Sequence, residues 1–173
     1  MRFKTVLLFG CLVLLAGCGP LPDPNSFVGR TAPDFEVETF QSKAAKQTLS
    51  AFKGKPVILD FWATWCGPCK QLTPHVETVY EEFKSQGLEG MAITDQDRET
   101  VAKFESVTPH KLPVYIDQSE LAGGAFRANA LPRVIIIDRK GKIIYDQTGY
   151  APGTLYDTEK AMRQAVKSAI ASA

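Results

Sequence analysis

Two cysteines separated by two residues, Cys66 and Cys69, are the side chains of this sequence best suited to chemistry. They follow an apolar run at 57–59 and begin a segment, residues 67–86, whose apolar residues recur at helical spacing. A C-x-x-C pair that opens a helix in a β-α pattern indicates a redox-active dithiol, in which two thiols form a disulfide and open it again.

The position at the helix start gives the two thiols different roles. The free N–H groups and the dipole of a helix N-terminus stabilise an anion, so the thiolate of Cys66 should form more readily than that of a free cysteine. We therefore expect Cys66 to be the attacking nucleophile. Cys69 is expected one turn further along and more buried, where it would resolve the mixed disulfide by attacking Cys66.

An aspartate, Asp60, stands inside the apolar strand that we expect at 57–62. An ionised carboxylate in such a strand is costly unless it is paired. Three interpretations are open: an ion pair with a lysine, a strand end that reaches solvent, or burial that raises the pKa until the group carries a proton near neutral pH. In the third, Asp60 lies beneath the dithiol and takes the proton from Cys69.

The elements that position these residues follow from hydrophobic periodicity. The expected strands are 35–39, 47–49, 57–62, 88–93, 114–116, 133–137 and 142–147. The expected helices are 50–52, 67–86, 98–106, 121–126 and 153–173. Pro74 should kink the long helix, because it lacks an N–H and clashes with the preceding turn. Strands that alternate with helices and end in a hairpin predict an α/β fold with a mixed central β-sheet flanked by helices and an N-terminal hairpin extension.

The segment at 60–70, D-F-W-A-T-W-C-G-P-C-K, resembles the active-site segment of thioredoxins. The similarity covers roughly residues 28–173, which we take as one domain. The resemblance implies a thioredoxin-like three-layer sandwich. It also implies that Cys66 is the nucleophile, Cys69 the resolving thiol and Asp60 the buried proton acceptor.

The same resemblance implies a cis-proline opposite the dithiol, just before an inner strand. Pro132 fits that place, because the strongly apolar segment 133–137 follows it; Pro113 is the alternative, but a weaker strand follows it. Leu131 would then offer its backbone to a substrate chain as a short strand pairing. The residues that we expect to contact substrate are Trp65, Gly67, Pro68, Leu131 and Pro132.

The N-terminus has the pattern of an export signal. A positively charged start leads into an apolar run at 6–16 that is too short to span a membrane and ends in Leu-Ala-Gly-Cys. This resembles a bacterial lipoprotein signal at 1–17, which implies that the mature chain begins at a lipidated Cys18. The Pro-rich segment 18–27 would be a tether. The alternative is an uncut, weak membrane anchor.

An exported, lipid-anchored chain of this kind resembles the extracytoplasmic thiol–disulfide reductases, some of which serve cytochrome c maturation. Many of those carry a glutamate three residues after the second cysteine, where this chain has Leu72. The resemblance implies a place outside the cytoplasm on a bacterial membrane: the periplasmic side or outer membrane of a Gram-negative cell, or the cell membrane of a Gram-positive one. The implied partners are disulfide-containing exported proteins and a membrane electron donor that re-reduces the dithiol.

Other functions have weaker support. The chain has 173 residues, 45% of them hydrophobic, and a formal net charge of +1, so it has no basic excess that would indicate nucleic-acid binding. No cofactor and no metal are expected: zinc needs four ligands and only His75 and His110 remain beside the thiols, and we expect His75 to be solvated. Haem attachment would need a histidine where Lys70 stands.

Three further alternatives concern the cysteines and the surface. A structural disulfide is the first, and the flanking Trp65 and Asp60 weigh against it. The opening at 32–35 resembles peroxiredoxins, so a thiol peroxidase is the second, although Leu59 and Ala63 replace the proline and threonine that those enzymes place before the cysteine. A non-catalytic lipoprotein that binds a partner by its surface is the third.

Overall fold

The computed structural model describes residues 26–151 and 153–172. The export signal and the lipidation site predicted at Cys18, with most of the tether, therefore lie outside the described residues. Within the described part of the chain, no helix combines the length and the apolar character that crossing a membrane requires.

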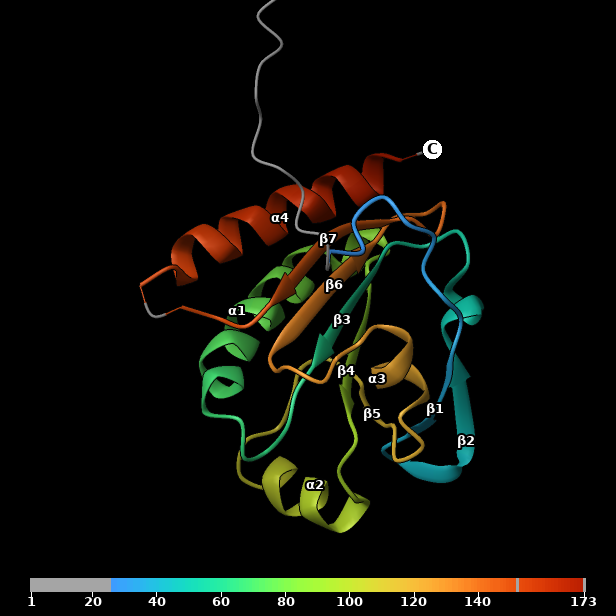
Figure 1. Cartoon of the computed structure of the whole chain (residues 1–173), viewed down its shortest axis with the longest axis vertical. Coiled ribbons are helices and arrows are strands. Elements are labelled where there is room, and N and C mark those ends of the chain that lie inside the picture. Colours follow the sequence, from blue (N-terminus) through green and yellow to red (C-terminus); the bar gives the residue numbers. More distant parts are fainter. Residues whose placement is uncertain (1–25, 152, 173) are drawn as a thin grey trace, which may run out of the picture.

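The described residues form seven strands and four α-helices, which are arranged as Figure 1 shows. The strands are β1 (Glu36–Thr39), β2 (Ser42–Thr48), β3 (Val57–Phe61), β4 (Glu89–Thr94), β5 (Val114–Ile116), β6 (Arg133–Ile137) and β7 (Ile143–Thr148). The helices are α1 (Gly67–Phe83), α2 (Arg98–Glu105), α3 (Leu121–Ala125) and α4 (Leu155–Ala171), with short 3-10 turns η1 (Leu49–Phe52) and η2 (Lys84–Gln86).

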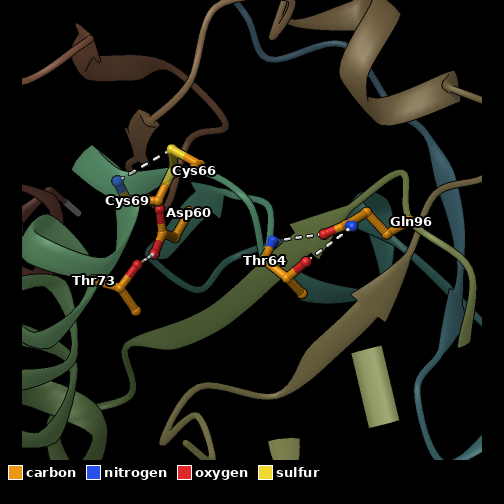
Figure 2. The surroundings of a disulfide bond; sticks show 6 residues. All are labelled: Asp60, Thr64, Cys66, Cys69, Thr73 and Gln96. Atoms are coloured by element: carbon orange, nitrogen blue, oxygen red, sulfur yellow. Dashed lines mark hydrogen bonds between the residues drawn. A yellow bond between two sulfur atoms is a disulfide. The ribbon is translucent and has the colours of Figure 1, made fainter. Parts of the chain in front are cut away.

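The strands form one mixed sheet in the order β2-β1-β5-β4-β3-β6-β7. The central strands β3, β4 and β5 are parallel, whereas β1 pairs antiparallel with β2 and β5, and β6 pairs antiparallel with β3 and β7. β3 is buried along its whole length because both of its edges and both of its faces are covered. The turn from β3 into α1 carries the two cysteines (Figure 2).

Each face of the sheet has its own apolar core. On one face, Ile58 and Val134 of the sheet pack with the apolar sides of α1, α2 and α4. On the other face, Leu59 and Ile135 pack with Phe126, which follows α3, and with the chain that precedes β1. The alternation of side chains along β3 therefore sends successive residues into different cores. The predicted α/β sandwich with a mixed central sheet is confirmed.

The helix predicted at 67–86 begins where expected, and only its C-terminal end differs slightly from expectation. α1 ends at Phe83 and continues as η2 to Gln86, where Gly87 adopts a left-handed conformation with φ 93°. α1 continues through Pro74, and the kink that we expected there stays a prediction. The expectation that His75 is solvated holds only in part: its side chain is 32% exposed, and its Nδ1 lies 2.5 Å from Glu159 Oε2, a contact that joins α1 to α4.

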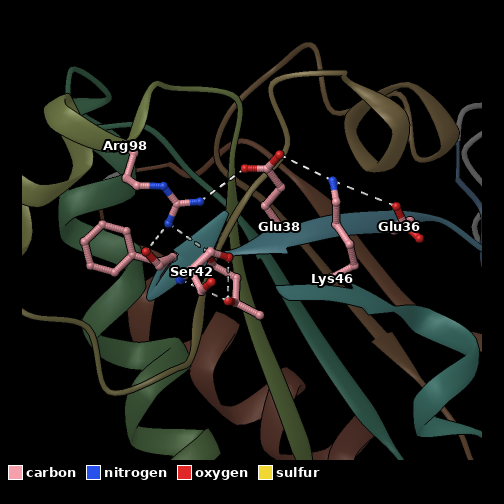
Figure 3. A network of polar contacts seen from close by, with 7 residues as sticks. Glu36, Glu38, Ser42, Lys46 and Arg98 are labelled. Atoms are coloured by element: carbon pink, nitrogen blue, oxygen red, sulfur yellow. Dashed lines mark hydrogen bonds and ion pairs between the residues drawn. The ribbon is translucent and has the colours of Figure 1, made fainter. Parts of the chain in front are cut away.

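β2 is much longer than the predicted strand at 47–49. Its sequence, SKAAKQT, shows no apolar alternation, because most of its side chains are exposed. Charged contacts hold this edge of the sheet (Figure 3): Arg98 of α2 pairs with Glu38 at 3.1 Å and donates to the carbonyl of Thr39 at 2.9 Å, and Lys46 lies 3.3 Å from Glu38. Backbone pairing and ion pairs, which leave no apolar pattern, therefore define this strand.

A buried ion pair ties the N-terminal segment to the sheet. Nε and Nη2 of Arg133 donate to the two carboxylate oxygens of Asp146 at 3.1 and 2.8 Å, and both side chains are at most 5% exposed. Asp146 also accepts a hydrogen bond from the backbone N–H of Phe27 at 2.7 Å. Removing one member would leave the other charge buried without its partner.

We expect the substitution Arg133→Ala to lower the free energy of unfolding by about 3–5 kcal/mol, because Asp146 would then be a buried, uncompensated carboxylate. Chemical denaturation measures this loss. The matched control is Lys103→Ala, which breaks a pair with Glu99 whose side chains are 74% and 79% exposed. It should change stability by less than about 1 kcal/mol, and equal losses in both variants would contradict the assignment.

Candidate active site

The two cysteines form a disulfide at the N-terminus of α1. Cys66 is the N-cap residue, and its Sγ accepts a hydrogen bond from the backbone N–H of Cys69 at 3.1 Å. Pro68 lies in the first turn, where its missing N–H removes no helical hydrogen bond. A sulfur at this position therefore lies where backbone N–H groups can stabilise a negative charge.

Exposure differs sharply among the residues around the disulfide. Cys66 and Cys69 are both buried, at 3% and 1% exposed, so the expected difference in burial between the two thiols stays a prediction. The Trp65 side chain is 71% exposed beside Cys66, and Gly67 and Pro68 are also exposed. The surface next to Cys66 is therefore formed by the exposed indole ring of Trp65 and by the turn at Gly67 and Pro68, which a substrate chain could contact.

Asp60 is fully buried on β3, with no exposed surface. Its Oδ2 accepts a hydrogen bond from Thr73 Oγ1 at 2.9 Å, and Thr73 lies one turn after Cys69 on the same side of α1. In the view of Figure 2 the Asp60 carboxyl projects between Cys69 and Thr73. Among the described residues, Oδ1 has no hydrogen-bond partner and no ion pair involves Asp60. Two of the three interpretations, the lysine pair and the solvated strand end, are therefore excluded.

Burial raises the pKa of Asp60 from 3.8 to about 6, against the hydrogen bond from Thr73, which lowers it. The folded protein therefore keeps this proton up to about pH 6, whereas the unfolded chain loses it near pH 3.8. Because the folded state binds more protons in that interval, its stability falls as the pH rises through it and stays lowered above it. A carboxyl with this pKa can exchange a proton near neutral pH.

A polar clamp that the sequence analysis missed holds the turn before the nucleophile. The backbone N–H of Thr64 donates to Gln96 Oε1 at 2.6 Å, and Gln96 Nε2 donates to Thr64 Oγ1 at 3.1 Å (Figure 2). Gln96 follows β4 and is 32 residues away in the chain, so no local pattern indicates it. The sequence does contain a signal for the partner of Asp60. Thr73 is a polar residue one turn after Cys69 on the buried side of α1, so a hydrogen bond to a buried group could have been expected there.

The proline expected opposite the dithiol has the predicted peptide geometry. The Leu131–Pro132 bond is cis, and no other cis peptide bond occurs in the described residues, which include Pro113. Arg133 pairs with Phe61 across β6 and β3, so extending this register by one residue places Pro132 opposite Trp62, at the end of β3 from which the dithiol turn departs. The substrate contacts predicted for Leu131 and Pro132 stay predictions.

Comparisons with known proteins agree with this geometry. The family model described as Redoxin matches residues 27–166. The thiol-disulfide oxidoreductase ResA of a Bacillus cereus strain is 33% identical over 152 residues, which are 82% of this chain and 87% of that protein. ResA of Geobacillus kaustophilus is 34% identical over 146 residues, 80% of this chain and 83% of that protein. A crystal structure from Chlorobium tepidum, provisionally assigned as a thiol:disulfide interchange protein DsbE, superposes with a TM-score of 0.70 and 28% identity, covering 81% of this chain and 95% of that one.

Replacing Asp60 by asparagine is expected to stabilise the oxidised protein at pH 8. The rise in pKa from 3.8 to about 6 means that the ionised carboxylate lowers stability by roughly 3 kcal/mol above pH 6. Asparagine carries no charge and keeps an oxygen for Thr73, so the gain should be about 2–3 kcal/mol at pH 8 and less than about 1 kcal/mol at pH 4. Urea denaturation at the two pH values measures it.

The control for this measurement is Asp157→Asn, which removes an exposed carboxylate near the start of α4. Its effect should stay within about 0.5 kcal/mol at both pH values. A D60N variant whose stability relative to wild type does not change with pH would show that Asp60 titrates alike in the folded and unfolded chains.

Proposed function

The chain belongs to the redoxin family and is a thiol–disulfide oxidoreductase, and from that premise we propose that it reduces disulfide bonds of exported proteins while anchored to a membrane. One observation carries the chemistry: a disulfide-forming pair at the N-terminus of α1, with the buried carboxyl of Asp60 hydrogen-bonded to the same helix. The pair accounts for electron transfer and the carboxyl for proton transfer.

The reaction begins from the reduced dithiol. The Cys66 thiolate attacks one sulfur of the substrate disulfide, the substrate S–S bond breaks, and the released sulfur takes up a proton from water. The product is a mixed disulfide between Cys66 and the substrate. The backbone N–H of Cys69, which donates to Cys66 Sγ in the oxidised protein, stabilises the attacking thiolate together with the helix dipole.

The second step closes the internal disulfide. Cys69 transfers its proton to ionised Asp60, and the Cys69 thiolate attacks Cys66 Sγ. The bond between Cys66 and the substrate breaks, and the second substrate sulfur leaves as a thiolate that takes up a proton. Two electrons have then passed from the dithiol to the substrate, and the enzyme is left as the Cys66–Cys69 disulfide.

The proposed direction and location rest on sequence features. Gly67 and Pro68 between the cysteines resemble the pair found in reducing thioredoxins, which favours reduction over oxidation. The lipoprotein signal predicted at 1–17 favours a site outside the cytoplasm, with the domain tethered at Cys18. There the disulfide must be reduced again by a membrane-bound dithiol donor, which returns two electrons for each turnover.

We expect the protein to catalyse the reduction of insulin disulfides by dithiothreitol, and the substitution Cys66→Ser to abolish this catalysis, because the nucleophile is lost. Cys69→Ser keeps the nucleophile but cannot resolve the intermediate, so it should accumulate a mixed disulfide that mass spectrometry detects.

The reduction potential of the Cys66–Cys69 pair should lie nearer to about −270 mV, the value of a reductant, than to about −120 mV, that of an oxidant.

The same assay separates the alternatives. Turnover of insulin that survives in C66S, or thiol-dependent consumption of hydrogen peroxide in place of disulfide reduction, would contradict the reductase assignment. Absence of any thiol-dependent turnover in the wild type would favour the non-catalytic lipoprotein.

Membrane attachment is tested on the full chain expressed in a bacterium. We expect the wild type to enter the detergent phase of a Triton X-114 partition, because acyl chains on Cys18 would insert into detergent micelles. Mass spectrometry should show that the wild-type chain begins at an acylated Cys18, whereas Cys18→Ser should carry no acyl chains and retain residues 1–17. Cys11→Ser, within the predicted signal, is the matched control and should leave the mature wild-type mass unchanged; a wild-type chain without acyl chains on Cys18 would refute lipidation at this residue.

A further inference from the structure

A small cavity of about 70 Å³ lies between α1 and the loop that joins α2 to β5, on the side of Cys69. Its walls combine Cys69 and Thr73 with two titratable side chains that the proposed mechanism does not use, Glu77 and His110. Thr73 is also the hydrogen-bond partner of Asp60. The cavity thus brings further charged groups close to the site of proton transfer.

His110 is held in a fixed position although it belongs to a loop. Its backbone N–H donates to Glu105 Oε2 at 3.0 Å, and its Nδ1 hydrogen-bonds to Glu105 Oε1. The ring lies 4.2 Å, centroid to centroid, from the indole of Trp62, two residues after Asp60, and the His110 side chain is only 4% exposed. A buried imidazole so fixed keeps a constant distance from the groups around it.

Of the three elements packed around Asp60, two supply charged groups. On α1, Glu77 is 8% exposed and its Oε1 accepts a hydrogen bond from the backbone N–H of Lys111 at 2.7 Å. The loop after α2 supplies His110 with its partner Glu105. The sheet supplies none, because the register partners of Asp60 on β4 and β6 are Ala92 and Val134.

Lys70, at the outer end of this region, is exposed, with its Nζ 5.7 Å from the centroid of the Phe104 ring. Its charge is therefore in contact with water and screened from the buried carboxyl. His110 is the buried group in this region that can bring a positive charge to balance Asp60 and Glu77.

We propose that His110, held by Glu105, is a positioning residue for the proton transfer at Asp60: a positive charge on its ring favours the ionised form of Asp60, which can accept the proton of Cys69. This inference rests on the proton-acceptor role given to Asp60 in the proposed function. Burial is the main cause of the raised pKa of Asp60; Thr73 and then the positive charge of His110 lower it, and Glu77 raises it. The transfer moves one proton from Cys69 Sγ to Asp60 and no electrons.

A purely structural role for His110 would be to fasten the loop to α2. That role predicts a loss of stability on substitution, with the titration of Asp60 unchanged. An electrostatic role predicts that the titration of Asp60 itself moves. Following the ¹³C resonance of the Asp60 carboxyl against pH in the oxidised protein separates the two, and it requires no turnover.

The variant is His110→Gln, which removes the charge and keeps an N–H donor for Glu105. We expect the Asp60 titration to move to higher pH in H110Q. The chain contains one other histidine, His75, which is also bonded to a glutamate but lies between α1 and α4. His75→Gln is therefore the matched control, and its Asp60 titration should coincide with that of the wild type.

A kinetic measurement connects this shift to the reaction. Below the pKa of Asp60, the rate at which Cys69 resolves a preformed mixed disulfide should fall about threefold or more in H110Q, the change that a rise of half a pKa unit produces. The rates of H110Q and wild type should converge at high pH, where Asp60 is ionised in both. A pH-independent loss of rate would indicate a structural role and overturn the proposal.

An unchanged Asp60 titration in folded H110Q, or an equal shift in H110Q and H75Q, overturns the inference. If H110Q does not fold, His110→Asn, which also removes the charge, is measured in its place, and an unchanged Asp60 titration in that folded variant overturns the inference. The two proposals can fail separately. If the Asp60 titration moves in H110Q but the rate at which Cys69 resolves the mixed disulfide is the same in Asp60→Asn as in the wild type, the proton-acceptor role of Asp60 in the proposed function is refuted.

Discussion

The hydrogen bond between Thr73 Oγ1 and Asp60 Oδ2 joins the helix that carries the dithiol to the strand beneath it. Both partners are buried, so the helix cannot move away from the strand without leaving a carboxyl group unpaired in an apolar core. The position of β3 in the sheet and the start of α1 are both tied to this hydrogen bond. β3 must be central for Asp60 to be dry, and α1 must start where β3 ends for the disulfide to lie near the carboxyl.

The burial of Asp60 lowers the stability of the folded protein while it supports the proposed proton transfer. An ionised carboxylate in a dry site destabilises the folded chain above the raised pKa, yet the same raised pKa lets Asp60 exchange a proton near neutral pH. The buried charges of Arg133 and Asp146, unlike that of Asp60, are balanced by a partner of opposite sign, because the two side chains form a bidentate ion pair. Among the buried charged groups of the described residues, Asp60 is the one with an oxygen that lacks a hydrogen-bond partner, and it lies at the site of chemistry.

The surroundings of the disulfide show how loops acquire fixed geometry. Gln96 fastens the turn before Cys66 from the end of β4, and Glu105 fastens His110 from the end of α2. Each clamp is a side chain that reaches across from a neighbouring element and bonds to a backbone N–H. Such hydrogen bonds fix irregular backbone in place, because they satisfy backbone N–H groups that would otherwise need a water molecule as partner.

The sequence by itself determined the features that depend on neighbours in the chain. The spacing of Cys66 and Cys69 and the apolar run before them are local patterns, and the α/β class follows from the alternation of strand and helix patterns along the chain. The cis-proline was implied by the resemblance to thioredoxins, and the apolar segment 133–137 favoured Pro132 for that place. The tertiary structure alone decided the partners of Asp60, the clamp by Gln96, the extent of β2 and the place of His110. The physical reason is that these contacts join residues far apart in the chain or lie on exposed surfaces, where neither helical nor strand periodicity constrains the residue type; only the folded chain brings the two groups within hydrogen-bonding distance.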